Sequence, residues 1–239
     1  MAHYGKPEYW DDRYTKDSDQ FDWYQRYAGL KDILKPHINT NHAILNIGCG
    51  SSRLSEEMHD DGYQNITNID ISSVVIKQMT EKYKEKYSTL KFAVMDAKKL
   101  EFPEGSFDVI IDKGTLDSIL CGDNAAQNAE LILSEIHKVL APLGVYICIS
   151  YGVPEQREIY YKGQDWEIKV NQVKKPNIFS TPVGTDKTGE DVKKAQYHYV
   201  YVMKKHDASE KKMNQPKEQQ EESKKDDSPT KEENEKTFE

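Results

Sequence analysis

Residues 43 to 54 read Ala-Ile-Leu-Asn-Ile-Gly-Cys-Gly-Ser-Ser-Arg-Leu, and a second apolar run closes at Asp70 about twenty residues later. The apolar residues predict a short buried strand. Gly48 and Gly50 predict a sharp turn into a helix, because glycine lacks the Cβ that would hinder the turn and keep a ligand away. An acid at the end of the next strand can accept hydrogen bonds from both hydroxyls of a ribose. The combination predicts a nucleoside-binding site.

The glycine turn lacks the features that hold phosphate groups. A dinucleotide fingerprint has a third glycine at the position where this chain has Arg53. No Gly-Lys-Ser or Gly-Lys-Thr follows the turn, which excludes a P-loop. Because a turn without a phosphate cradle suits a nucleoside without phosphate, we predict S-adenosylmethionine as the cofactor.

Composition limits the remaining possibilities. A chain of 239 residues is long enough for one sizeable α/β domain. Its formal net charge of −8 argues against direct nucleic-acid binding. Cys49, Cys121 and Cys148 are far apart, so neither a metal site nor a disulfide framework is predicted. No apolar leader or membrane-length run is visible, which favours a cytoplasmic protein without membrane association.

Between residues 43 and 204, strand and helix patterns alternate and then give way to a hairpin. Alternation at these lengths predicts a doubly wound parallel sheet. The final pair, joined by a long loop over 181–195, adds an antiparallel hairpin, as in the Rossmann-like methyltransferase fold. The predicted strands are 44–47, 66–70, 91–95, 107–112, 145–150, 167–173 and 196–203, and the predicted helices are 24–34, 54–60, a segment capped by Ser72 or Ser73, and 128–140.

Three regions follow from composition along the chain. Residues 1–42 hold an aromatic segment and a helix, and residues 43–204 form the core domain. Residues 205–239 are almost entirely charged or polar, and such a segment buries too little apolar surface to offset the entropy of ordering. We therefore expect a disordered, solvated tail.

Ligands in open parallel sheets bind at the carboxyl ends of the strands, so the residues there are candidates for chemistry. Asp96 can accept a hydrogen bond from an adenine amine, and the Ala97 amide can donate to a ring nitrogen. Asp112 and Asp117 are candidate catalytic acids that could steer an ammonium group, although each could equally cap a strand or helix end. Lys113 could pack along the cofactor or pair with Asp70 or Asp112.

The sequence that follows the predicted strand 107–112 also excludes some methyl acceptors. Methyltransferases that act on base amines or glutamine amides use an Asn/Asp-Pro-Pro-Tyr/Phe motif, which is absent here. An aliphatic amine needs less help, because it is a good nucleophile once it is deprotonated.

Before the first strand, an aromatic segment contains Trp10, Tyr14 and Trp23. It predicts a lid over the methionine and ribose side of the cofactor, with a satellite core as the alternative.

Taken together, the motifs resemble one family. They are Tyr9-Trp10-x-x-Arg13-Tyr14, Asp22-Trp23, Ile47-Gly48-Cys49-Gly50, Asp70-x-Ser72-Ser73, Met95-Asp96 and Asp112-Lys113-Gly114-Thr115-Leu116-Asp117. They are similar to those of the seven-β-strand methyltransferases that modify lysines of elongation factor 1-alpha: the lysine methyltransferase 4 group and the N-terminal domain of methyltransferase-like 13. The resemblance implies cofactor contacts at Trp10, Tyr14, Trp23, Gly48, Asp70, Asp96, Ala97 and Lys113.

The resemblance implies N-methylation of a protein lysine, with elongation factor 1-alpha as the partner. Three alternatives stay open: methylation of a protein α-amino terminus, methylation of a small molecule, and a non-catalytic interaction protein that retains the fold. The fold alone does not determine the substrate.

Overall fold

A computed structural model describes residue 4, residues 6–176 and residues 196–207. The strands are β1 (Ile44–Ile47), β2 (Ile66–Asp70), β3 (Lys91–Val94), β4 (Phe107–Lys113), β5 (Leu140–Ser150), β6 (Trp166–Lys174) and β7 (Tyr197–Lys205). The helices are α1 (Pro7–Lys16), α2 (Tyr27–Leu34), the 3-10 turn η1 (Lys35–His37), α3 (Leu54–Asp60), α4 (Ser73–Tyr83), α5 (Thr115–Leu120), α6 (Ala125–Val139) and α7 (Pro154–Tyr161).

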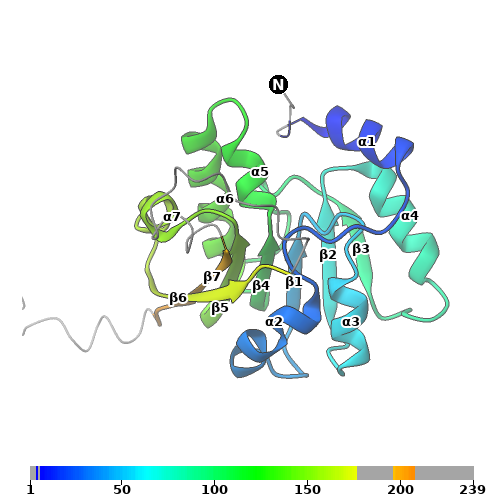
Figure 1. Ribbon diagram of the computed structural model, residues 1–239. Coiled ribbons are helices and arrows are strands. Elements are labelled where there is room, and N and C mark those ends of the chain that lie inside the picture. The colour runs from blue at the N-terminus through cyan, green and yellow to red at the C-terminus, as the bar shows by residue number, and fades with distance from the viewer. Residues whose placement is uncertain (1–3, 5, 177–195, 208–239) are drawn as a thin grey trace, which may run out of the picture. The chain divides into compact units, whose positions relative to one another are not determined.

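In the described part of the chain the strands form one seven-stranded sheet in the order β3-β2-β1-β4-β5-β7-β6 (Figure 1). Strands β1 to β5 are parallel, and β7 runs antiparallel to both β5 and β6. The predicted mixed sheet with a final antiparallel hairpin is therefore confirmed. The strand order reverses beside β1, which pairs with β2 on one side and β4 on the other. In open parallel sheets, that reversal opens a crevice at the carboxyl ends of the strands.

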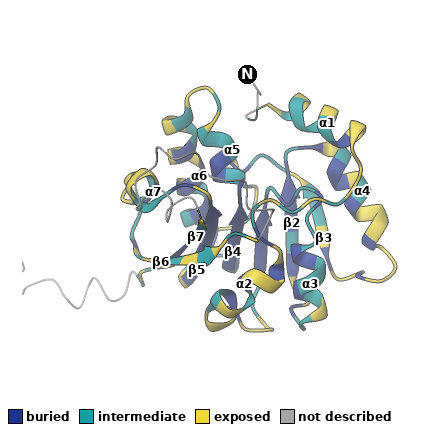
Figure 2. Ribbon diagram, viewed as in Figure 1, coloured by how far each residue is buried: buried dark blue, intermediate teal, exposed yellow. Residues whose placement is uncertain are grey.

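Helices cover both faces of the sheet, and alternate residues along the strands pack into two separate hydrophobic cores. Ile44 of β1 belongs to the core that contains α2, α3 and α4, whereas its neighbour Leu45 belongs to the core that contains α6 and α7. The central strands are consequently buried on both faces, as Figure 2 shows in dark blue. This explains the nearly continuous apolar run of β4.

Three short helices were not predicted from the sequence. Half of the residues of helix α1 are charged, helix α5 has only 6 residues, and α7 is polar apart from Pro154, Ile159 and its two tyrosines. Short helices with many polar residues give only a weak periodic signal in the sequence. They nevertheless matter, because α1 and α5 both border the crevice.

The junction of α6 and β5 also differs from the prediction. The helix begins at Ala125 rather than Asn128, and the strand already begins at Leu140. The stretch 141–144, which falls between the predicted helix and the predicted strand, lies in a register shift between the pairs Phe107–Leu140 and Val109–Val145. A bulge of this kind lets a strand contain a sequence with proline and glycine.

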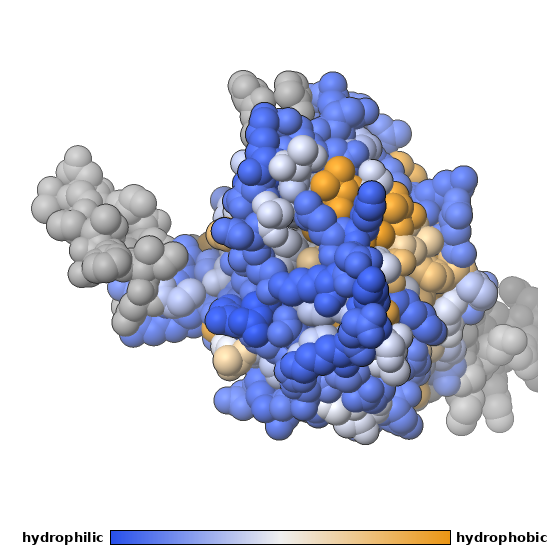
Figure 3. Space-filling model, turned by 90° about the vertical axis from the view of Figure 1, so that its right-hand side faces the viewer, coloured by the Kyte–Doolittle hydropathy of each residue, from blue (hydrophilic) through white to orange (hydrophobic). Residues whose placement is uncertain are grey.

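Strand β7 extends one residue past the predicted domain limit at 204. The Lys205 ammonium donates to the carbonyl oxygens of His137 (2.6 Å) and Leu140 (2.7 Å), which fixes the strand end against α6. The predicted loop over 181–195 and the tail from 208 onward lie outside the described residues. No helix in the described residues has the length and hydropathy to cross a membrane. The face on the β3 side is largely hydrophilic, with one hydrophobic area (Figure 3).

Candidate active site

The turn after β1 fits only glycine at two positions. Gly48 has φ +58°, and a Cβ there would lie 2.0 Å from the Thr115 hydroxyl, which donates to the Ile47 carbonyl oxygen (3.0 Å). Gly50 has φ +52°, and a Cβ there would lie 2.7 Å from the Tyr14 hydroxyl. The Thr115 and Tyr14 side chains therefore pack closely against the turn, and the turn itself lines a cavity.

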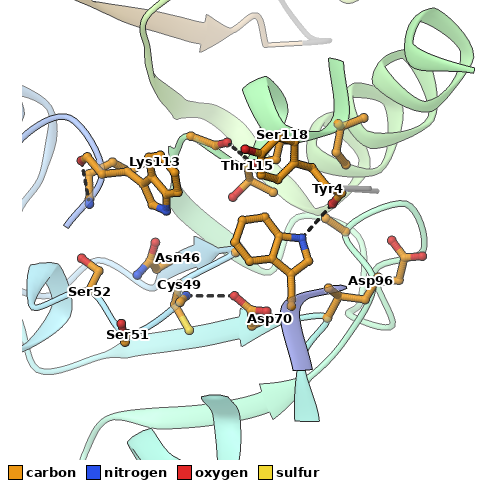
Figure 4. A pocket seen from close by; sticks show the side chains of 18 of the residues that line it. Tyr4, Asn46, Cys49, Ser51, Ser52, Asp70, Asp96, Lys113, Thr115 and Ser118 are labelled. Atoms are coloured by element: carbon orange, nitrogen blue, oxygen red, sulfur yellow. Dashed lines mark hydrogen bonds between the residues drawn. The ribbon is translucent and has the colours of Figure 1, made fainter. Parts of the chain in front are cut away.

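Asp70 lies at the carboxyl end of β2, beside this turn. Its carboxylate accepts hydrogen bonds from the backbone N–H groups of Gly50 and Ser72, both at 2.9 Å. These bonds fix the rotamer and leave further lone pairs on both oxygens for a ligand. Burial raises the pKa of Asp70 to about 6, despite the two N–H donors, which favour the ionised form. Figure 4 shows Asp70 facing the cavity.

Asp96 and Ala97 border the same cavity after β3. One carboxylate oxygen of Asp96 accepts the Lys98 N–H at 2.9 Å, and the other pairs with the Lys98 ammonium at 3.4 Å. Asp96 thus caps the turn that follows β3. This role does not exclude adenine binding, because the side chain is 39% exposed and lines the cavity.

Helix α1 brings the first aromatic residues to the site. Its Asp11 carboxylate accepts the Ser72 hydroxyl (2.5 Å) and the Val74 N–H (3.3 Å), which docks α1 on the N-terminus of α4. The Trp10 indole stacks on Tyr14 with ring centroids 6.0 Å apart. Both rings line the cavity.

Lys113 pairs with Asp22, which corrects the predicted pairing with Asp70 or Asp112. Its ammonium donates to the Asp22 carboxylate (3.0 Å) and to the Trp23 carbonyl oxygen (3.1 Å). Asp22 also accepts the Ser52 hydroxyl and the Arg53 N–H (3.4 Å). Burial lowers the pKa of Lys113, and the Asp22 charge opposes that shift. The pair ties the aromatic segment to the ends of β1 and β4.

One cavity brings every predicted cofactor residue together. It also contains residues that the sequence analysis missed, among them Tyr4, Thr115 and Ser118 (Figure 4). Their sequence pattern did not indicate a role here, because only the fold places α5 and Tyr4 beside the glycine turn. The predicted residues that line it are Trp10, Tyr14, Trp23, Gly48, Gly50, Asp70, Asp96, Ala97 and Lys113.

The donor set of this cavity fits S-adenosylmethionine. Asp70 offers carboxylate oxygens to ribose hydroxyls, and the Gly48–Gly50 turn lines the cavity beside it. Aromatic faces at Trp10 and Trp23 suit a sulfonium and an apolar ring. Among the residues that line the cavity, none builds a phosphate cradle of the P-loop type, in keeping with a nucleoside that carries no phosphate.

The two predicted catalytic acids, Asp112 and Asp117, do not line the first cavity. Asp112 is fully buried and accepts hydrogen bonds from the N–H groups of Thr115 (2.8 Å) and Leu116 (3.1 Å) and from the Tyr146 hydroxyl (3.1 Å). It does not line the cavity. Burial raises its pKa to about 7. Asp117 borders a second, adjoining cavity. Their catalytic roles stay predictions.

Comparison with known proteins identifies the type of domain. Residues 38–227 match a family model described as a methyltransferase domain. The fold is similar to a SAM-dependent methyltransferase from Methanosarcina mazei, with a TM-score of 0.54 and 19% identity over 78% of this chain and all of that one. That similarity supports the fold alone.

Two curated relatives are closer in sequence. The EEF1A lysine methyltransferase 4 of Mus musculus is 34% identical over 178 residues, which cover 70% of this chain and 69% of the relative. The eEF1A lysine and N-terminal methyltransferase of Bos taurus is 38% identical over 176 residues, or 71% of this chain. The match covers only 25% of that longer relative.

Proposed function

This chain belongs to the methyltransferase family and is an S-adenosylmethionine-dependent enzyme, and we propose that it methylates a lysine of elongation factor 1-alpha. The relatives support the choice of acceptor, since two different relatives are named as eEF1A lysine methyltransferases. The geometry of the candidate site is compatible with an amine acceptor, because the cavity that borders Asp117 is walled by aromatic rings.

In this proposal the cofactor supplies an electrophilic methyl group on a sulfonium. Asp70 accepts hydrogen bonds from the ribose hydroxyls, Asp96 and Ala97 contact the adenine, and the Gly48–Gly50 turn lies beside the amino-acid part. Trp10, Tyr14 and Trp23, within residues 1–42, cover the sulfonium side and limit access of water. Lys113 holds this cover in place through Asp22.

Methylation of a protein α-amine is the second candidate. A relative whose name includes N-terminal methylation favours it. The two acceptors have the same chemistry, in which an amine lone pair attacks the methyl carbon. They differ in the length and shape of the chain that carries the nitrogen.

Mass spectrometry of elongation factor 1-alpha tests both candidates. The unmodified factor, purified from bacteria, is incubated with the enzyme and S-adenosylmethionine that carries a trideuterated methyl group. We expect the label on one lysine and none with the Asp70→Ala enzyme. Label on the N-terminal peptide alone would favour the α-amine. No label on either, with cofactor binding intact, would contradict this acceptor.

A further inference from the structure

A second cavity of about 210 Å³ adjoins the cofactor cavity. The two share Tyr4, Trp23, Gly114 and Ser118 as walls. Trp23 is 37% exposed and Tyr151 is 47% exposed, so the second cavity opens to solvent between aromatic rings. A side chain projecting from a large molecule could enter here and reach the first cavity.

Tyr24 is one of the residues that line this second cavity. It has φ +63°, a conformation that is rare for a bulky side chain and is retained where the surroundings enforce it. Its ring packs on Gly114, where a Cβ would come within 3.2 Å of it. The rings of Trp23 and Tyr151 approach it edge-on, at 6.2 and 6.1 Å. The end of β4 and these neighbours therefore hold the ring in one orientation.

The Tyr24 hydroxyl donates to Asp117 at 2.8 Å. Because its single proton is used in that bond, its lone pairs are free to accept a hydrogen bond. Burial, reinforced by the Asp117 charge, raises the pKa of Tyr24, so the phenol stays neutral. A neutral acceptor can bind an amine N–H while the nitrogen lone pair points elsewhere.

Asp117 itself makes several further hydrogen bonds within the fold. Its oxygens already accept the Ser150 hydroxyl (2.6 Å), the Tyr151 N–H (3.0 Å) and the Arg157 guanidinium (2.9 and 3.0 Å). The Arg157 charge balances the carboxylate within the buried pair. This arrangement suits a residue that orients the Tyr24 hydroxyl.

We propose that the second cavity receives the acceptor amine and that the Tyr24 phenol oxygen positions it, with Asp117 as the residue that orients Tyr24. The inference rests on the proposed transfer of methyl groups to an amine. The Trp23 and Tyr151 rings pack along the methylenes of the incoming chain. The nitrogen lone pair forms the bond to the methyl carbon, the carbon–sulfur bond breaks, and its electrons stay on sulfur. The nitrogen then releases its proton to water at the open mouth.

The experiment measures binding, so it does not depend on the identity of the acceptor. Three mimics of the cofactor carry a tertiary nitrogen in place of the sulfonium. One bears a methyl group, one an alkylamine arm, and one a hydrocarbon arm of the same length. Calorimetry compares their affinities for the full-length protein and for Tyr24→Phe. The control is Tyr27→Phe, which removes the hydroxyl of a tyrosine that lines neither cavity and donates to Asp61 at 2.8 Å.

In the wild type we expect the amine arm to bind about fivefold more tightly than the hydrocarbon arm, as one added hydrogen bond allows. Tyr24→Phe should bring that ratio to about one while the methyl mimic binds as before, and Tyr27→Phe should leave the ratio unchanged. Tyr151 forms an exposed wall of the cavity, and Tyr151→Ala should weaken the binding of both arm-bearing mimics about threefold through lost packing. A ratio that survives in Tyr24→Phe would overturn the proposal.

The outcomes also separate this inference from the proposed function. Elongation factor 1-alpha could fail to be methylated while the preference for the amine arm over the hydrocarbon arm still depends on Tyr24. In that case the acceptor is a different amine and the inference stands. If the factor is methylated but both arms bind more weakly than the methyl mimic, the cavity does not receive the acceptor and the inference is wrong.

Discussion

At the scale of single residues, Asp70 joins the glycine turn to the predicted ribose contact. Replacing it with alanine removes two acceptors for backbone N–H groups and the acceptor for the ribose. We expect Asp70→Ala to weaken S-adenosylmethionine binding by about 10- to 100-fold, equivalent to about 1–3 kcal/mol. Calorimetric titration against wild type measures the change, with Asp61→Ala as a control in a distant ion pair. Equal affinities would refute the ribose assignment.

The pKa of Asp70 also predicts how cofactor binding depends on pH. Burial raises this pKa from 3.8 to about 6, so the carboxyl of the free protein is protonated below pH 6 and ionised above it. Ribose hydroxyls donate to the ionised form, and binding therefore favours loss of the proton. Affinity should be constant above pH 7 and about tenfold lower at pH 5.

Titrations from pH 5 to 8 check this dependence. An Asp70→Asn variant provides the control, because it keeps an acceptor oxygen without the titration and should give a flat profile. A wild-type profile as flat as that of the variant would contradict the prediction.

Substitutions of Asp112 distinguish a structural role of its carboxyl group from a catalytic one. Asn at this position preserves an acceptor oxygen and resembles the protonated acid that burial favours below about pH 7. We expect Asp112→Asn to change stability by less than about 1 kcal/mol, and Asp112→Ala to lose about 2–3 kcal/mol through unsatisfied N–H groups. Turnover of Asp112→Asn should stay within about threefold. Its loss in a stable Asn variant would support direct participation.

At the scale of elements, the buried Lys113–Asp22 pair ties the aromatic segment to β4. Its side chains are only 5% and 9% exposed. Asp22→Ala should destabilise the protein by about 3–5 kcal/mol, because it leaves a buried ammonium without its partner. Arg26→Ala, which breaks an ion pair whose arginine is 55% exposed, should cost less than about 1 kcal/mol. Denaturant unfolding compares the two. Similar losses in both variants would show that the buried pair does not anchor the segment.

The sequence was most informative where local pattern and burial agree. Strands β1 and β2 and helix α3 were predicted at their observed limits, because apolar runs bounded by glycine or aspartate leave few alternatives. Helices α1 and α7 escaped prediction, because they are stabilised by docking rather than by an apolar stripe. The bulge in β5 could not be predicted locally, because it depends on pairing with β4.

The residues that line the first cavity were predictable for a related reason. Strand ends in a parallel sheet converge on one edge, so Gly48, Asp70 and Asp96 could be placed together from order along the chain. The Lys113–Asp22 pair and the position of Tyr24 beside Asp117 join residues about ninety apart in sequence. No local pattern predicts which partner such a side chain meets.

At the scale of the whole molecule, the last described strand ends with Lys205 bonded to α6. The composition of the tail predicts that it contributes nothing to the chemistry. A chain that ends at Asp207 should keep turnover on a protein substrate within about twofold of full length. Steady-state rates of the two chains test this. A tenfold fall, or about 1.4 kcal/mol in the barrier, would show that the tail helps to bind substrate.

The central claim is that this enzyme transfers methyl groups from S-adenosylmethionine to a protein amine. Tritium transfer from labelled cofactor into a cell lysate tests it most directly, with the Asp70→Ala enzyme as the background. We predict label in one protein band, at the size of elongation factor 1-alpha, that resists mild base as an N-methyl group does. Label confined to the small-molecule fraction would contradict the claim.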